Sequence, residues 1–147
     1  MFKKIVCPVG LEEESFKAVP VGAKLAKTFG AELFLLHLDD RFMSEEEMVM
    51  LRVSSTKEQE EIRQRAVHAK RVIEETCAKL GVSGSVSGVV LREGSKDKDI
   101  PHIAEKLGAD LIVTHSTGRD RIGEQITGTT SESILKHAKV SVLILFD

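Results

Sequence analysis

Residues 103–113 read IAEKLGADLIV, and this stretch joins the end of an expected helix to the start of a buried strand. The helix is expected over Lys98–Leu107, with Gly108 directly after its last residue as a natural helix-ending glycine. The strand is expected over Asp110–His115, and its centre, Leu111–Val113, is a continuous apolar run. A helix that leads through a short turn into such a strand is typical of folds in which helices connect parallel strands.

The same alternation of strand and helix extends through the whole chain. Further strands are expected at Lys4–Val9, Glu32–Leu38, Val86–Leu91 and Val140–Phe146. Further helices are expected at Glu13–Thr28, within Ser44–Gly81 and at about Thr129–Ala138. The order predicts an α/β fold with an open parallel sheet, helices on both faces and a flavodoxin-like or Rossmann-like topology.

Two helix boundaries stay open at the level of sequence. Pro20 falls inside the Glu13–Thr28 pattern, and because proline fits best in an early helical turn, the start of this helix is not determined. The Ser44–Gly81 region carries two helix-start signals. It therefore holds either one helix or two, with a break near Val53–Ser55.

Length and composition limit the kind of protein this is. With 147 residues, the chain is expected to form a single domain over residues 1–147 with a sizeable core. Its 21 basic and 23 acidic residues give a net charge of −2, which argues against a general nucleic-acid binder. The chain has no Trp and no Tyr, so a platform that stacks bases on aromatic rings is not expected either.

The apolar segments and the cysteines bear on cellular location. No stretch approaches the ~20 apolar residues of a membrane span, and the apolar start of the chain is too short for a secretory signal. Cys7 and Cys77 cannot make a disulfide framework. We therefore expect a cytoplasmic protein without membrane contact, with both thiols reduced and with Cys7 in the core.

One loop carries a chemical signal. It leaves the Asp110–His115 strand, passes Gly118, and reaches Gly128, Thr129 and Thr130 at the start of the last helix. A helix N-terminus offers free N–H groups and partial positive charge to a phosphate, a glycine allows close approach, and hydroxyls add donors. From residue chemistry alone the alternative stays open that Gly128 is a turn residue and Thr129 a plain helix cap.

The candidate binding site lies at the carboxyl edge of the expected sheet. In open parallel sheets, ligands sit beyond the carboxyl ends of the strands, at the point where the strand order reverses. If the Lys4–Val9 and Asp110–His115 strands flank that point, Val9, Gly10 and His115 form its rim. These three residues join those of the loop as candidate ligand-binding residues.

Several stretches taken together resemble the universal stress protein family. The opening KKIVCPV, residues 3–9, is similar to the family's first strand, and residues 15–33 are similar to its first helix and the turn into its second strand. Residues 103–113 and 128–138 are similar to the segments around its fourth strand and last helix. The pieces occur in order and at the right separations over nearly the whole chain.

The resemblance implies a strand order of 3-2-1-4-5, an adenine nucleotide alpha hydrolase-like fold, frequent homodimers and, in some members, ATP binding. The nucleotide-binding members carry Gly, two residues, Gly, nine residues, and then Gly with Ser or Thr. Gly118, the nine-residue spacer and Gly128 with Thr129 match this pattern, whereas His115 replaces its first glycine. Gly10 stands where those members place an aspartate that helps hold the nucleoside.

These departures leave three hypotheses open. A lost hydrogen bond from a carboxylate costs about 1.5–3 kcal/mol, or roughly one to two decades in affinity. His115, Arg119 and Arg121 could in turn supply positive charge to a phosphate. In the first hypothesis, the chain is a non-enzymatic, stress-associated homodimer with a degenerate nucleotide-binding loop. In the second, it is an ATP-binding switch with slow or no hydrolysis, and in the third it is an interaction module with a vestigial pocket.

Other residue patterns favour no further chemistry. His37 and Asp39 could meet a ligand near the rim, or form a strand-end pair that faces solvent. Histidine and cysteine spacings indicate no metal site, and neither the G-x-x-x-x-G-K-[ST] nor the G-x-G-x-x-G motif occurs. No serine, histidine and aspartate pattern points to a catalytic nucleophile, so enzymatic activity is not predicted.

The last strand, Val140–Phe146, is an edge strand in the order 3-2-1-4-5. A long apolar edge without charge or proline is an aggregation hazard unless it is covered. Pairing with the same strand of a second copy would cover it and obey two-fold symmetry. We therefore expect a homodimer through Val140–Phe146.

Overall fold

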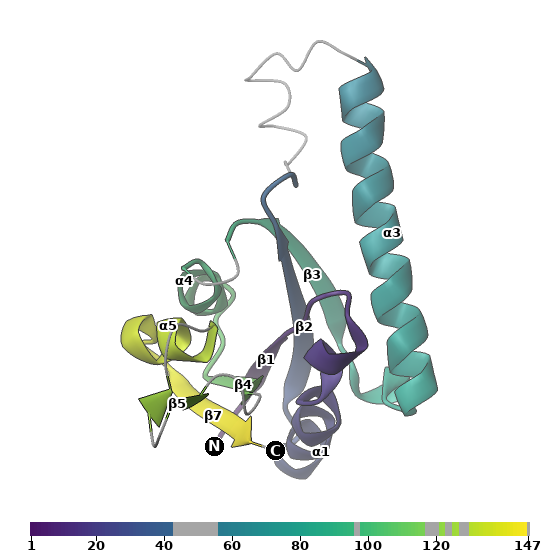
Figure 1. Ribbon diagram of the computed structural model, residues 1–147. Helices are drawn as coiled ribbons and strands as arrows, with labels where there is room; N and C mark the ends of the chain where they lie inside the picture. The colour runs from purple at the N-terminus through teal and green to yellow at the C-terminus, as the bar shows by residue number, and fades with distance from the viewer. Residues whose placement is uncertain (43–55, 96–97, 117–120, 123–124, 127–129, 147) are drawn as a thin grey trace.

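The sheet of the computed structural model confirms the predicted α/β class and strand order. The structure describes residues 1–42, 56–95, 98–116, 121–122, 125–126 and 130–146. Within them, a five-stranded parallel sheet has the order β3-β2-β1-β4-β7 (Figure 1). Its strands are β1 (Lys4–Pro8), β2 (Glu32–Asp39), β3 (Gly88–Glu93), β4 (Leu111–Ser116) and β7 (Ser141–Phe146).

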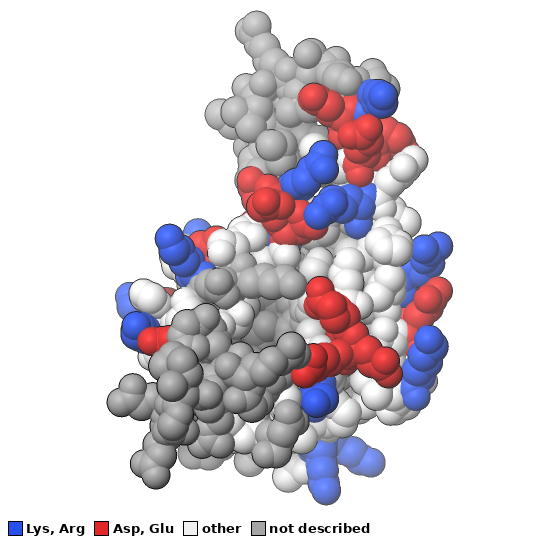
Figure 2. Space-filling model, viewed as in Figure 1, with Lys and Arg blue, Asp and Glu red and all other residues white. Residues whose placement is uncertain are grey.

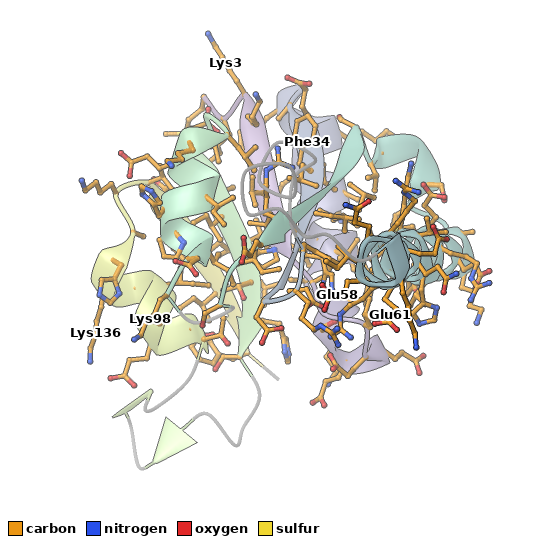
Figure 3. The ribbon with its side chains drawn as sticks, turned by 90° about the horizontal axis from the view of Figure 1, so that it is seen from above. Lys3, Phe34, Glu58, Glu61, Lys98 and Lys136 are labelled. Carbon is orange, nitrogen blue, oxygen red and sulfur yellow. The ribbon has the colours of Figure 1, made fainter. Side chains whose placement is uncertain are left out.

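Helices cover both faces of this sheet. They are α1 (Val19–Phe29), α3 (Thr56–Leu80), α4 (Ile100–Lys106) and α5 (Thr130–His137), with short 3-10 turns η1 (Glu13–Phe16) and η2 (Ser83–Ser85). α1 and α3 lie on one face, and α4 and α5 lie on the other (Figure 1). Seen from above, Glu58 and Glu61 on α3 lie on one side of the molecule and Lys136 on α5 lies on the other (Figure 3).

Three expected segments gain detail in the structure. The helix expected over Glu13–Thr28 is two elements, η1 and α1, because Pro20 lies in the first turn of α1, where a missing backbone N–H costs no helical hydrogen bond. In the Ser44–Gly81 region, α3 begins at Thr56, and residues 43–55, with the suggested break, lie outside the described residues. The loop after β4 contains a short antiparallel pair, β5 (Arg121–Ile122) and β6 (Gln125–Ile126).

β1 is the central strand, and its side chains supply both cores. Ile5, Val6 and Cys7 are fully buried. Ile5 and Cys7 pack into the core under α1 and α3, whereas Val6 packs into the core under α4 and α5, as the alternation of a strand requires. Burial, and secondarily the neighbouring Cys77, raises the pKa of the Cys7 thiol to about 12, so the prediction that Cys7 is a core residue is confirmed.

The start of β1 is fixed to the segment that enters β4. The Asp110 carboxylate accepts hydrogen bonds from the backbone N–H groups of Lys3 at 2.8 Å and Lys4 at 3.2 Å. The Lys4 ammonium group also donates to the Leu107 carbonyl at 3.1 Å. Because these contacts set the two parallel strands side by side, their carboxyl ends open at the same edge of the sheet.

Candidate functional site

A cavity of about 340 Å³ lies at the carboxyl ends of β1, β2 and β4. Val9, Gly10, His115 and Thr130, four of the residues singled out from the sequence, line it together. The other three, Gly118, Gly128 and Thr129, lie outside the described residues. The remaining lining residues are Pro8, Glu12, Glu14, Ser15, Leu36, Leu38, Ile100 and Thr114.

The turn after β1 forms one wall of the cavity. The backbone N–H of Gly10 donates to Ser15 Oγ at 2.8 Å, and the Ser15 hydroxyl donates to the Glu12 carbonyl at 2.7 Å. At the base of this turn, the backbone N–H of Val9 donates to the Leu36 carbonyl of β2 at 2.9 Å. The turn is therefore closed on itself and tied to the sheet, and it holds Glu12 and Glu14 at the cavity.

The opposite wall is built from the end of β4 and the start of α5. Thr114 is buried, His115 is half-buried, and Thr130 is the first residue of α5. The apolar side chains of Leu36, Leu38 and Ile100 complete the lining, and all three belong to the core under α4 and α5. The cavity therefore combines an apolar base with hydroxyl, imidazole and helix-terminal N–H groups, which suits a flat ligand with a polar end.

The formal charge on the described walls of the cavity is negative. Among the described lining residues, Glu12 and Glu14 carry full charges, and neither lysine nor arginine is present. Within this set, positive potential for a phosphate comes from the start of α5 and from an imidazole that gains charge on protonation. Such walls hold a polyanion less strongly than a lysine-lined or arginine-lined site would.

Sequence reasoning found the ends of β1 and β4 but missed the contribution of β2 and of the turn after β1. Leu36 and Leu38 alternate along β2, which places both on the same face of the sheet, and this spacing could have indicated them. Glu12 and Glu14 reach the cavity because Ser15 closes the turn. No residue pattern in the sequence signals that closure.

His37 and Asp39 have different surroundings in the structure. His37 is 4% exposed, and its Nδ1 lies 2.9 Å from the Val9 carbonyl oxygen, so the interpretation that it faces solvent is wrong. Its ring also meets Phe42 edge-on, with ring centroids 5.9 Å apart. Asp39 lies at the end of β2, where its Oδ2 is 2.6 Å from Nε of Arg65 on α3.

A larger hollow of about 710 Å³ lies between η1, the start of α1 and the end of α3. It is lined by Phe16, Pro20 and Leu80 among others, and its described lining includes no residue of a sheet strand. Ligands of parallel sheets bind at the strand ends, so we take the smaller cavity as the candidate site.

Two kinds of feature are absent from the part of the chain that the structure describes. None of the helices there is both long and apolar enough to cross a membrane. Nor do these residues bring together three or more His, Cys, Asp or Glu side chains that could hold a metal ion.

Comparisons with known proteins agree on one family. The model of the universal stress protein family matches residues 1–145. The curated universal stress protein MJ0531 of Methanocaldococcus jannaschii is 27% identical over 147 residues, which cover 99% of this chain and 82% of that protein.

Solved structures of the same fold cover nearly the whole chain. The structure of the hypothetical protein MJ0577 is 26% identical and has a TM-score of 0.64, with 100% of this chain and 97% of that chain covered. UspA from Lactobacillus plantarum has a TM-score of 0.66 at 21% identity, with 97% of each chain covered. A universal stress protein in complex with cAMP has a TM-score of 0.62 at 16% identity, with 99% of this chain and 97% of that chain covered.

Proposed function

This chain belongs to the universal stress protein family, and we propose on that basis that it is a non-enzymatic stress-response protein that binds an adenine nucleotide weakly. The observation that supports this proposal is the cavity in which Val9, Gly10, His115 and Thr130 meet. Its apolar base fits a purine ring, and Thr130 brings the start of α5 to the cavity, where helix-terminal N–H groups suit a phosphate.

Three features of the site support weak binding. Gly10 supplies no carboxylate to the nucleoside, and its backbone N–H is already bound to Ser15. His115 places a ring where the nucleotide-binding pattern has a glycine, which narrows the approach to the cavity. Glu12 and Glu14 repel a triphosphate, and the cost of such repulsion grows as water is excluded.

We further propose that two copies pair through β7 and that the chain works as one domain in the cytoplasm. Among the described strands, β7 pairs with β4 alone, so it is an edge of the sheet. Its Leu143 and Phe146 side chains are 36% and 44% exposed. A second β7 strand would cover both the edge and this apolar surface.

The test of nucleotide binding begins with an ultraviolet spectrum of the purified protein. Because the chain has no Trp and no Tyr, a retained adenine nucleotide would dominate the absorbance near 260 nm. We expect a phenylalanine-only spectrum, followed by weak, saturable heat when ATP with magnesium is titrated into the protein. A universal stress protein of the same fold was crystallised in complex with cAMP, so cAMP belongs in the same titration series.

The outcomes of this test separate the candidate functions. Stoichiometric ATP released on denaturation would favour a nucleotide-dependent switch. The nine-residue spacer between Gly118 and Gly128, with Thr129 after it, is the sequence feature that supports this alternative. Absence of heat with either nucleotide at millimolar concentration would leave an interaction module with a vestigial pocket. If binding occurs through the loop, Gly128→Val abolishes it and leaves the oligomeric state unchanged.

A further inference from the structure

A second cavity, of about 420 Å³, lies where β2 and β3 end beside α3. Its polar lining consists of Glu12, His37, Asp39, Asp40, Arg65 and Ser95. It adjoins the first cavity, because Glu12 and Leu38 border both. Figure 2 shows acidic and basic side chains gathered in this part of the surface, where the Asp39–Arg65 ion pair joins β2 to α3.

His37 lines this cavity from the face of the sheet that α1 and α3 cover. Along β2, Leu36 and Leu38 belong to the core under α4 and α5, whereas Leu35 belongs to the core under α1 and α3. Alternation places His37 on the same face as Leu35. The second cavity therefore has its own polar centre, separate from the base of the first.

One ring nitrogen of His37 is hydrogen-bonded, and the other has no hydrogen-bond partner among the described residues. A carbonyl oxygen only accepts hydrogen bonds, so the Nδ1 that lies 2.9 Å from the Val9 carbonyl oxygen carries a proton, and Nε2 has a lone pair whenever the ring is neutral. No buried side-chain nitrogen or oxygen in the described part is left unsatisfied, so Nε2 keeps accessible surface, and His37 lines the cavity.

The charges around this lone pair favour a cation. Burial opposes ionisation of Asp39, but hydrogen bonds with the Arg65 side chain, the Arg41 backbone N–H and the Asp40 side chain, together with the Arg65 charge, lower its pKa below the ordinary value. Asp39 is thus a carboxylate that already has a partner in Arg65. Glu12 and Asp40 add two further carboxylates to the lining, and Arg65 is the single lysine or arginine among the described lining residues.

We propose that this cavity binds a small organic cation with N–H donors, a primary ammonium compound, which donates to Nε2 of His37 and lies between the carboxylates of Asp40 and Glu12. A lone-pair acceptor, an excess of acids and a volume suited to a small molecule all favour this chemistry. A metal ion fits less well, since the described residues form no cluster of three potential ligands. The proposal is independent of whether the first cavity binds a nucleotide.

The experiment uses butylammonium as the probe and the imidazole NMR signals of His37 as the readout. The full chain is titrated at constant ionic strength with butylammonium chloride, butyltrimethylammonium chloride and sodium butyrate. We expect a saturable shift of His37 Nε2 with butylammonium. Butyltrimethylammonium carries the charge without an N–H donor and is expected to bind several-fold more weakly, and butyrate is expected to cause no shift.

A variant and its control separate the cavity from the general surface charge. Asp40 is exposed, so Asp40→Asn is expected to leave the fold intact and to weaken butylammonium binding about threefold, as expected for a partly solvated ion pair. Glu105→Gln removes an equally exposed carboxylate on α4, away from the cavity, and is expected to change nothing.

The remaining outcomes overturn the proposal. It is wrong if butylammonium causes no saturable shift of His37, or if Glu105→Gln weakens binding as much as Asp40→Asn does. If butyltrimethylammonium binds as tightly as butylammonium, Nε2 of His37 does not accept a hydrogen bond from the ligand. A shift caused by zinc chloride and not by butylammonium would replace the amine site with a metal site.

Discussion

The Ser15 hydroxyl accepts the Gly10 backbone N–H at 2.8 Å and donates to the Glu12 carbonyl at 2.7 Å. One side chain thus closes the turn between β1 and η1. Gly10 is buried, so its N–H would otherwise lack a partner in a position that water reaches poorly. The shape of one wall of the candidate nucleotide cavity therefore depends on this hydroxyl.

Ser15→Ala is expected to destabilise the protein by about 1 kcal/mol, because it leaves the Gly10 N–H without its acceptor. This corresponds to a decrease of roughly 3 °C in the melting temperature of a chain of this length. Urea denaturation followed by circular dichroism measures it. Ser83→Ala, at an exposed position in η2, is the control and should leave the midpoint unchanged. Equal stability of the two variants would show that Ser15 does not fasten the turn.

Gly10→Asp is expected to strengthen ATP binding about tenfold, by restoring a carboxylate that accepts hydrogen bonds from a nucleoside. Gly10 is not among the described glycines with positive φ, so the backbone admits a side chain there. Calorimetric titration with ATP and magnesium measures the change. Gly84→Asp, where an added side chain meets open space, is the control for adding a carboxylate away from the cavity. Unchanged affinity in Gly10→Asp would mean that the nucleoside lies elsewhere.

Leu143→Asp is expected to convert a dimer into a monomer at micromolar concentration. The substitution places a charge on the exposed side of β7, where two copies would bring like charges together. Light scattering coupled to size-exclusion chromatography measures the mass. Val67→Asp, at a 63% exposed position on α3, is the control and should remain dimeric. A monomeric parent protein would contradict pairing through β7.

The Asp39–Arg65 ion pair makes stability depend on pH in the acid range. The pKa of Asp39 is lowered on folding, so its contribution is present above its ordinary value of 3.8 and is lost as pH falls through the lower folded value. The Arg65 side chain is 47% exposed, which limits the contribution to about 1 kcal/mol or less. Asp39→Asn should therefore be less stable than the parent at pH 6 and equal to it near pH 2.

Urea titrations at a series of pH values measure this dependence. Arg63→Gln removes a neighbouring pair on the surface of α3, in which both side chains are more than half exposed, and serves as the control. It should change stability less than Asp39→Asn at pH 6. A constant difference between Asp39→Asn and the parent from pH 6 to pH 2 would show that the carboxylate charge is not responsible.

The positions of the strands were predictable from the sequence because each buried strand is a short apolar run of its own, whereas their order was implied by the resemblance to the universal stress protein family. Leu33–Leu36 and Leu111–Val113 are examples, and each lies in a strand of the sheet. The start of α1 was left open, because the choice between an early turn and a helix interior for Pro20 depends on how the preceding turn closes.

Part of the candidate site could be predicted from the sequence and part could not. Val9 and His115 were found from strand ends alone. The environment of His37 was not, because its burial depends on the Val9 carbonyl and on Phe42. Asp39 likewise meets Arg65 only because α3 passes the end of β2, a contact between residues far apart in the chain.

Because β1 is the central strand of the sheet, it is expected to unfold later than the outer parts of the molecule. β1 lies between β2 and β4, so we expect its amide hydrogens to exchange with solvent later than those at the edges of the sheet. The first turns of α3, where most side chains are exposed, can fray and re-form without disturbing that sheet. Val9 and Gly10 follow directly from β1, so the candidate nucleotide cavity is anchored to the part of the protein that opens most slowly.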